Sequence, residues 1–436
     1  MKNLYIILGL LLLIACGRND LDQAPPLEAS SASLDNYAGV LNAAYYYQQA
    51  STTPMAVMGD FRADNMLMEE EPYPAFDRFN SDLAGGDLVG QFFQPFYSNL
   101  YKSILSANNV ISNSTDNTEI GEAQFLRALS YFKLVQVFGD VTVNLEESPS
   151  VDDKSILART RAEEVYSNVI IPDFEAAISA LDNSNISSGR ASKLAAQGLL
   201  GKVYMHLSDF NNAERLLATV VNDAPDAGIM LLDSFADIFA AGSDLNAEVI
   251  YATQQSSSIN DEYGFTLFPG WFSGGDTKSL APLDPDLIAA FDESSEDDLR
   301  REVTINEDNL TSPKYGNGLE QDWIELRLGD VILLYAEALN ESNNTDDAID
   351  ELNKIRNRAG LDDYDGDTDQ ATVRQVIADE RRLELALEGH RWFDLVRTGT
   401  VSQEMGISVE PEYYVFPLPD SEILASDGAI TQNEGY

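Results

Sequence analysis

A helix-hairpin repeat in the middle of the chain constrains the fold more than any other feature of the sequence. The tetratricopeptide pattern places a Leu-Gly pair and a Tyr on one helix, then an Ala, a large apolar residue and a closing Pro on the next. The chain carries this pattern at Leu200-Gly201, Tyr204, Ala213, Leu217 and Pro225. One hairpin of this kind cannot bury its apolar face alone and needs neighbouring hairpins to stack against. The pattern therefore predicts an array of packed helix pairs.

The rest of the sequence is consistent with such an array. A degenerate second copy follows Leu334, where Ala348, Leu352 and Ile355 keep the spacing of the second helix. Apolar residues also recur every three to four residues, which is the period of a half-buried helix. The segments with this period are 122–138, 196–207, 323–338 and 373–387. Strand signals are sparse, so we expect an all-α fold with tetratricopeptide-like helices at about 91–223 and 320–398.

Two long stretches lack a helical period. Residues 51–90 and 253–318 are rich in Gly, Pro, Asp, Ser and aromatic residues. Long irregular segments inside a domain are usually functional or disordered, and a high aromatic content argues against disorder. We therefore expect these two stretches to form an irregular binding subregion.

The N-terminus has the features of a bacterial lipoprotein leader. Lys2 precedes an apolar run from Leu4 to Ile14, which is too short to span a bilayer as a helix. The residues before Cys16 resemble a lipobox, in which the cysteine is acylated and becomes the first residue of the mature protein. We therefore predict a signal peptide at 1–15, lipidation of Cys16, a flexible tether over 16–32 and a single helical domain over 33–436.

Charge and residue usage exclude several classes of function. The chain has 73 acidic and 27 basic residues and a formal net charge of −46, which repels nucleic acid. It has one cysteine and two histidines. An intramolecular disulfide is therefore impossible, and a His/Cys zinc site or a Cys/His nucleophile pair is nearly excluded. We expect no cofactor, no metal and no catalytic residue.

Several blocks of sequence, in order along the chain, carry a resemblance to the SusD/RagB family of outer-membrane nutrient-binding lipoproteins. They are Glu122–Val141, Arg190–Tyr204, Leu326–Glu341, Ile355–Leu361, Glu380–Arg397 and Phe416–Tyr436. Together with the region around Cys16, these blocks extend from one end of the chain to the other.

The resemblance implies a function as well as a fold. Members of this family are non-catalytic lids over a SusC-like TonB-dependent barrel, and they bind a glycan or, in some members, peptides. The resemblance therefore implies a lipid-anchored glycan-binding protein on the outer membrane, facing the exterior. A peptide-binding subunit of the same kind of importer is an alternative. A secreted glycoside hydrolase with paired carboxylates is a less favoured one.

Ligand-binding residues are expected in the two irregular stretches, because sugars are held by aromatic faces and a few polar groups on loops. In the first stretch the resemblance singles out Arg78, followed by Phe93 on the helix after it, and the candidates near Arg78 are Tyr73 and Asn80. Phe replaces the Trp that family members often carry at the position of Phe93. The alternative for Phe93 is a core position on a helix.

The second candidate cluster contains Tyr263, Trp271 and Phe272. Trp271 and Phe272 lie between glycines with no helical period, and an exposed aromatic pair of this kind is costly in water unless it meets a ligand. Internal packing of the loop is the equally weighted alternative.

Two charged segments are interpreted as structural. Arg62 and Asp64 tie their loop to the scaffold, since Asp commonly bonds nearby backbone. The segment Glu380–Arg397 is expected to form a packed helix with a charged rim, in which His390 and Trp392 have structural roles.

Overall fold

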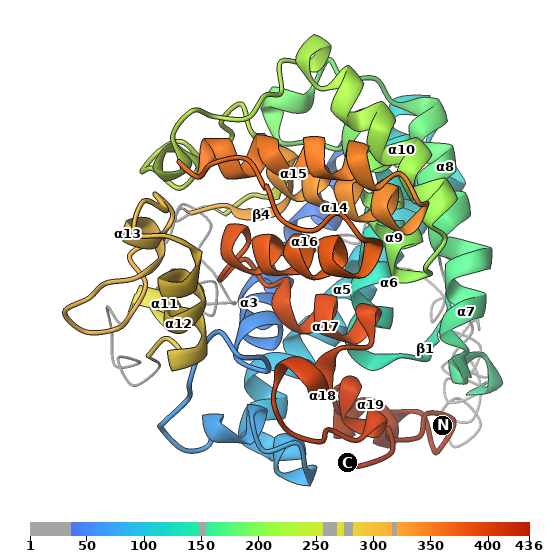
Figure 1. Ribbon diagram of the computed structural model, residues 1–436. Helices are drawn as coiled ribbons and strands as arrows, with labels where there is room; N and C mark the ends of the chain where they lie inside the picture. Colours follow the sequence, from blue (N-terminus) through green and yellow to red (C-terminus); the bar gives the residue numbers. More distant parts are fainter. Residues whose placement is uncertain (1–35, 148–153, 256–267, 274–281, 316–320) are drawn as a thin grey trace, which may run out of the picture.

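The computed structural model describes residues 36–147, 154–255, 268–273, 282–315 and 321–436. The predicted signal peptide, Cys16 and the whole predicted tether lie outside these ranges, as does Tyr263. The described part is mainly helical (Figure 1). No helix within these ranges has both the length and the apolar character that a membrane span requires.

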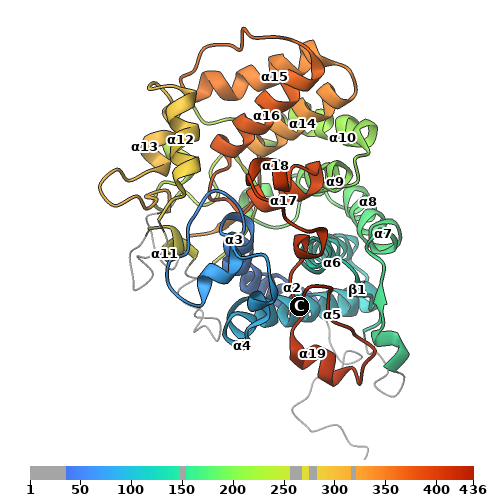
Figure 2. The same cartoon turned by 60° about the horizontal axis from the view of Figure 1, so that its bottom comes forward.

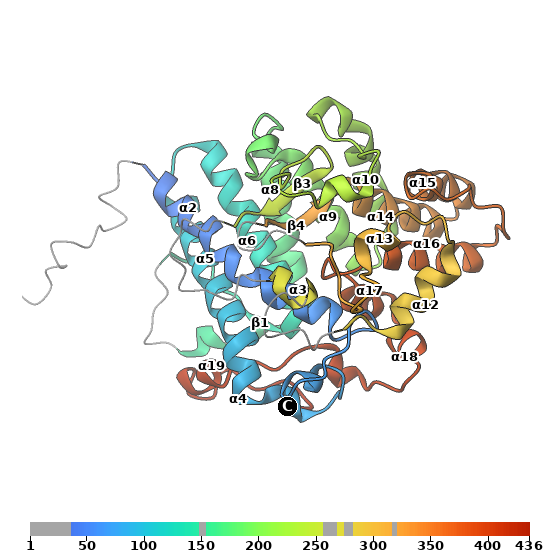
Figure 3. The ribbon, with the colours of Figure 1, turned by 90° about the vertical axis from the view of Figure 1, so that its left-hand side faces the viewer.

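The scaffold is a succession of helices in which each packs against the next. The first half contains α2 (Ala38–Gln48), α5 (Gln94–Asn113), α6 (Asn117–Phe138), α7 (Ala162–Val165) and α8 (Ile171–Ala180). The second half contains α9 (Lys193–His206), α10 (Phe210–Asp223), α14 (Leu328–Glu341), α15 (Thr345–Arg358) and α16 (Gln370–Glu384). Contacts run from α2 to α5, α6, α8, α9, α10, α14 and then α15 and α16. Figure 3 shows α2, α5 and α6 at one side of the molecule and α14, α15 and α16 at the other.

The repeat predicted from the sequence is confirmed as the hairpin of α9 and α10. Its helices begin at side-chain caps, Ser192 for α9 and Asp209 for α10. A Cβ placed on Gly201 would lie 2.6 Å from a methyl group of Leu217, so only glycine allows this approach. The degenerate second copy is the hairpin of α14 and α15, in which Ala348 is fully buried.

In two places the apolar spacing of three to four residues continues beyond the helix that the structure shows. Trp323–Arg327 is the strand β4, which pairs antiparallel with β3 (Val249–Thr253), and α14 begins only at Leu328. Both faces of this short pair are largely buried, so its apolar residues mimic a helical stripe. Similarly, α16 ends at Glu384, and Leu387 beyond it has a positive φ of 66°. A second small sheet pairs β1 (Val141–Thr142) with β2 (Arg159–Thr160).

The irregular stretches contain short helices that cover one side of the repeat. The first holds α3 (Thr52–Asp60) and α4 (Gly86–Leu88), and the second holds α11 (Phe268–Ser273), α12 (Pro285–Ser294) and α13 (Arg301–Thr304). The C-terminal segment adds α17 (Arg391–Thr398), α18 (Val401–Glu404) and α19 (Asp420–Ala425). Viewed from below, α4 and α19 lie near the C-terminus (Figure 2).

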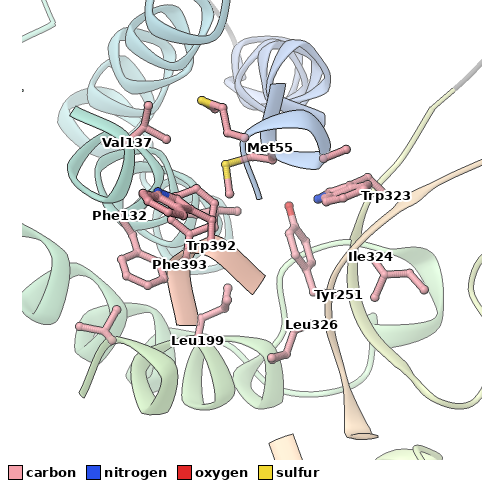
Figure 4. Close-up of a cluster of buried hydrophobic side chains, with 14 of the residues drawn as sticks. Met55, Phe132, Val137, Leu199, Tyr251, Trp323, Ile324, Leu326, Trp392 and Phe393 are labelled. Atoms are coloured by element: carbon pink, nitrogen blue, oxygen red, sulfur yellow. The ribbon is translucent and has the colours of Figure 1, made fainter. Parts of the chain in front are cut away.

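The core joins the repeat to these covering segments. Side chains from α3, α6, α9, the β3–β4 pair and α17 meet in one apolar cluster (Figure 4). Trp392 is fully buried in it and donates from its indole N–H to the carbonyl of Tyr414 at 3.3 Å. The structural role expected for Trp392 is therefore what the structure shows. The helix α3 is buried along its whole length.

Candidate functional site

The loop after α3 is held rigidly by carboxylates that reach the C-terminal part of the chain. Asp60 accepts hydrogen bonds from the side-chain amide of Asn65 at 2.8 Å and from the backbone N–H of Gly389 at 2.7 Å. Burial raises the pKa of Asp60 to about 6 despite these bonds. Asp64 accepts two hydrogen bonds from the guanidinium of Arg391, at 2.7 and 2.8 Å. These contacts fix the base of the first irregular stretch.

Arg62 supports the same loop from inside. Its guanidinium is fully buried and donates to the carbonyls of Phe76 and Tyr413, each at 2.8 Å. It also lies 4.5 Å from the ring centroid of Phe79, within cation–π range. Burial lowers the pKa of Arg62 from its usual value. The expected tying role of Arg62 and Asp64 is therefore what the structure shows.

The two candidate clusters, separate in the sequence, meet in one aromatic cluster. Trp271 makes an edge contact with Tyr73 at a centroid distance of 5.0 Å and another with Phe92 at 5.5 Å. Phe272 stacks on Phe61 at 5.8 Å. Aromatic side chains of α11 thus pack against those of the segment that follows α3.

Burial corrects the expectation that these aromatic side chains are exposed. Trp271 is 2% exposed, and Phe272 and Phe93 are fully buried. The prediction that Trp271 and Phe272 form an exposed pair is therefore wrong, and the equally weighted alternative, internal packing, is the arrangement observed, because both rings pack inward on Phe61. The core alternative for Phe93 is the arrangement observed, with its ring against Phe416 at 5.7 Å.

The polar candidates lie along the segment 73–80, which begins at Tyr73 in the aromatic cluster and forms a rim at the surface. Tyr73 is half-buried, and its hydroxyl donates to the Oε1 of Gln91 at 3.2 Å. The exposed guanidinium of Arg78 is paired with Glu71 and, at 3.5 Å, with Asp82. Asn80 caps the following turn by accepting from the backbone N–H of Asp82 at 2.9 Å. Of the predicted site residues that are described, Tyr73, Arg78 and Asn80 thus reach the surface.

Larger cavities open in two places elsewhere in the described structure. The first, of about 410 Å³, lies between α2 and the end of β3. Its lining includes Tyr45 and Tyr46 from α2, Arg190, and the amides of Gln49 and Gln254. The prediction from the sequence did not select these residues. The only signal was the run Tyr45-Tyr46-Tyr47-Gln48-Gln49, which looks like an ordinary amphipathic helix when its surroundings are unknown.

The second cavity, of about 290 Å³, lies between α14, α16 and α17 and is lined by ion pairs. Arg397 bonds Glu337 at 2.6 and 2.7 Å, and Arg381 bonds Asp394 at 3.0 Å. Although burial opposes ionisation, the nearby guanidinium groups lower the pKa of Asp394. His390 lies at its edge, where burial, followed by the charge of Lys202, lowers the pKa of His390 to about 4. The His390 ring is therefore neutral at physiological pH and has a structural contact, at 3.1 Å from the Lys202 ammonium.

The described residues contain no cluster of three or more His, Cys, Asp or Glu side chains that could hold a metal ion. The fold and its surface thus combine a stacked helical scaffold with aromatic and amide groups in recesses and on rigid loops. This combination is typical of helical-repeat proteins, whose stacked hairpins display extended surfaces.

Comparison with known proteins gives the family. Residues 20–205 match the family described as "Starch-binding associating with outer membrane", and residues 301–412 match the SusD family. SusD-like protein P2 of Formosa agariphila is 25% identical to this chain over the full length of both. The chain belongs to the SusD/RagB family.

Solved structures show the same fold. A SusD homologue from Bacteroides thetaiotaomicron superposes with a TM-score of 0.77 at 20% identity, covering 91% of this chain and 96% of that one. A laminarin-binding SusD-like protein superposes with a TM-score of 0.71 at 23% identity, covering 92% of this chain and 99% of that one. The all-α, tetratricopeptide-type fold expected from the sequence is therefore confirmed.

Proposed function

We propose that this protein is a non-catalytic, lipid-anchored glycan-binding protein of the outer cell surface, which delivers oligo- or polysaccharide to a SusC-like TonB-dependent barrel. The observation that carries the proposal is the match of residues 20–205 to a family described as starch-binding and associating with the outer membrane. The structural similarity to a laminarin-binding SusD-like protein supports the same ligand class.

The surface chemistry supports capture of sugars. Sugar rings pack on aromatic faces while their hydroxyls pair with amide, carboxylate or guanidinium groups. Tyr73, Arg78 and Asn80 offer these groups along the segment 73–80, and Gln91 bonds the hydroxyl of Tyr73. The buried guanidinium of Arg62, which bonds the carbonyl of Phe76, holds this segment from inside. We therefore retain Tyr73, Arg78 and Asn80 as candidate ligand contacts of this rim.

The described cavities favour binding over hydrolysis. A glycosidase needs one carboxylic acid that keeps its proton, opposite a second carboxylate. In the cavity beside α17, Glu337, Glu341 and Asp394 are each ion-paired with an arginine, and the nearby guanidinium groups lower the pKa of Asp394. Such carboxylates suit a structural role and not that of a general acid.

The proposal assigns the remaining parts of the chain to targeting and attachment. Residues 1–15 are the signal peptide, Cys16 carries the acyl chains and residues 16–32 form the tether of a single ligand-binding domain over 33–436. Two or three acyl chains hold a protein firmly at a bilayer without a membrane-spanning helix.

Native gel electrophoresis of the purified protein through gels containing starch, laminarin or an acidic polysaccharide tests this function. We expect retardation by a neutral polysaccharide and no release of reducing sugar after long incubation. Release of reducing sugar would contradict the non-catalytic role. Binding of peptides without binding of any glycan would favour the peptide-binding alternative.

A further inference from the structure

The groove between α2 and the end of β3 differs in charge from the rest of this strongly acidic protein. Its described lining contains aromatic rings, amides, small residues and one guanidinium, but no carboxylate. The guanidinium, Arg190, is neutralised from behind by Glu122, whose Oε2 lies 2.7 Å away and whose side chain is only 6% exposed. The groove is therefore close to electrically neutral.

Hydrogen bonds hold the aromatic wall of the groove in a fixed position. The hydroxyl of Tyr45 donates to Glu122 at 2.5 Å and accepts from the backbone N–H of Ala191 at 2.9 Å. The guanidinium of Arg190 lies 4.6 Å from the Tyr45 ring centroid. Tyr46, the next residue of α2, is half-buried and lines the same groove. A rigid aromatic surface binds a sugar ring with little loss of side-chain entropy.

Amide groups complete the groove in positions set by other bonds. Gln49 donates to the backbone carbonyl of Gln254 at 2.8 Å, and Asn42 accepts from Arg190 at 3.0 Å. The exposed side chain of Gln254 lies across Gly189, where an added Cβ would approach its amide to 2.8 Å. Gly189 also has a φ of 72°, so a glycine is favoured there for two reasons.

We propose that this groove is a binding site for a short segment of neutral oligosaccharide, distinct from the rim at Tyr73. Its volume of about 410 Å³ falls in the range of small-molecule sites. The nine-residue helix α3 separates the two places, because Gln255 beside the groove bonds Thr52 at its start and Phe61 of the aromatic cluster follows its end. At 1.5 Å per residue this separation is roughly 13 Å. The inference rests on the proposed function and adds to it a site and a neutral class of ligand.

The test compares two adjacent tyrosines of α2. Tyr46→Ala removes a ring that lines the groove. Tyr47→Ala removes a half-buried ring that touches Tyr46 edge-on at a centroid distance of 5.6 Å and lies 5.6 Å from the ammonium of Lys102, but does not itself line the groove. Calorimetric titration uses oligosaccharides prepared from laminarin and from starch, with a thermal melt of each variant. We expect Tyr46→Ala to weaken binding on the order of tenfold or more and Tyr47→Ala to leave it within about twofold.

Gln254→Ala provides a second variant that alters only an exposed side chain, so it is expected to fold normally. It should weaken binding in the same direction as Tyr46→Ala. If the wild-type protein binds these sugars and both groove variants bind them equally well, the groove assignment is overturned and the proposed function stands. If the wild-type protein binds no neutral glycan at all, the proposed function and the groove assignment both fail.

Discussion

Glu384, the last residue of α16, provides the sharpest test of how this scaffold is stabilised. Its carboxylate is fully buried and pairs with three guanidinium groups, those of Arg300, Arg327 and Arg358. The distance to Arg327 is 2.6 Å and that to Arg300 is 3.4 Å. We predict that Glu384→Gln, which keeps the shape of the side chain, destabilises the protein by about 3–5 kcal/mol, because it leaves buried cations without this partner.

The pKa of Glu384 gives an independent magnitude. Burial alone would raise this pKa, but Arg358, Arg327 and Arg300 outweigh burial and lower it from 4.5 to about 2. At 1.36 kcal/mol per pKa unit, this difference favours the ionised native state by roughly 3 kcal/mol. Because the pKa is lower in the folded state than in the unfolded one, this stability is present above pH 4.5 and is lost as the pH falls toward 2.

Urea denaturation of the wild type and the variant, followed by circular dichroism at pH 7 and at low pH, measures both quantities. The matched control is Glu341→Gln, since Glu341 pairs with Arg374, whose side chain is 48% exposed, and such surface pairs contribute about 0–1 kcal/mol. The difference between wild type and Glu384→Gln should shrink as the pH falls below 4.5. A variant within 1 kcal/mol of the wild type at pH 7 would refute the view that this carboxylate is essential to the buried network.

Three further predictions concern the anchor, the aromatic cluster and pH. Cys16→Ser should move the protein from the membrane fraction to the soluble fraction or leave it unprocessed, because the acyl chains supply its membrane affinity; unchanged membrane retention without a barrel partner would contradict this. Trp271→Ala should lower the free energy of unfolding by about 3–5 kcal/mol, as expected for a core Trp. Tyr73→Ala at the half-buried rim should instead weaken glycan binding with a smaller loss of stability, and titration plus a melt on both variants separates the two outcomes. Burial raises the pKa of Asp77 from 3.8 to about 8, so its stabilising contribution is full below pH 4 and is lost as the pH rises through 8. Asp77→Asn should therefore gain stability relative to the wild type on going from pH 5 to pH 9, and urea titrations that show a constant difference would exclude this pKa.

The sequence predicted the repeat well because its signal is local. The spacing of Leu200, Gly201, Tyr204 and Ala213 depends only on helix geometry and on the close approach of paired helices. The same reasoning failed at Trp323, where a buried strand pair has an apolar pattern that a short window cannot distinguish from a helix.

The charged block at the end of α16 shows a second limit. The charged rim expected for the segment Glu380–Arg397 would be formed by pairs three residues apart on one helix face, Arg381 with Glu384 and Glu388 with Arg391. The helix ends at Glu384, however, and each of these side chains pairs with a residue distant in sequence. Arg381 bonds Asp330, and Glu388 bonds Arg327. The charges are buried, so their partners depend on tertiary structure, which no local spacing encodes.

The candidate ligand contacts were harder to predict for a related reason. Trp271 lies between glycines and looks exposed in the sequence, yet α11 turns its ring onto Tyr73 and Phe92. Tyr45 and Tyr46 look like an ordinary helix face, yet β3 and Arg190 form a groove beside them. Whether an aromatic side chain lies in the core or is available to contact a ligand therefore depends on which segments cover it.

Burial of basic side chains makes the charge of the surface differ from the charge balance of the whole sequence. Of the 27 basic residues, at least nine are buried in the described structure, among them Arg62, Lys133, Arg300 and Arg327, against at least twelve of the 73 acidic residues. The fraction of cations lost to the interior is about twice that of anions, so the surface is more acidic than the sequence implies. The negative field of this surface would repel a polyanionic glycan at long range but not a neutral glycan. Ring stacking and hydrogen bonds between neutral groups depend little on salt concentration. The carboxylate-free groove is thus suited to a neutral ligand that is bound by these interactions.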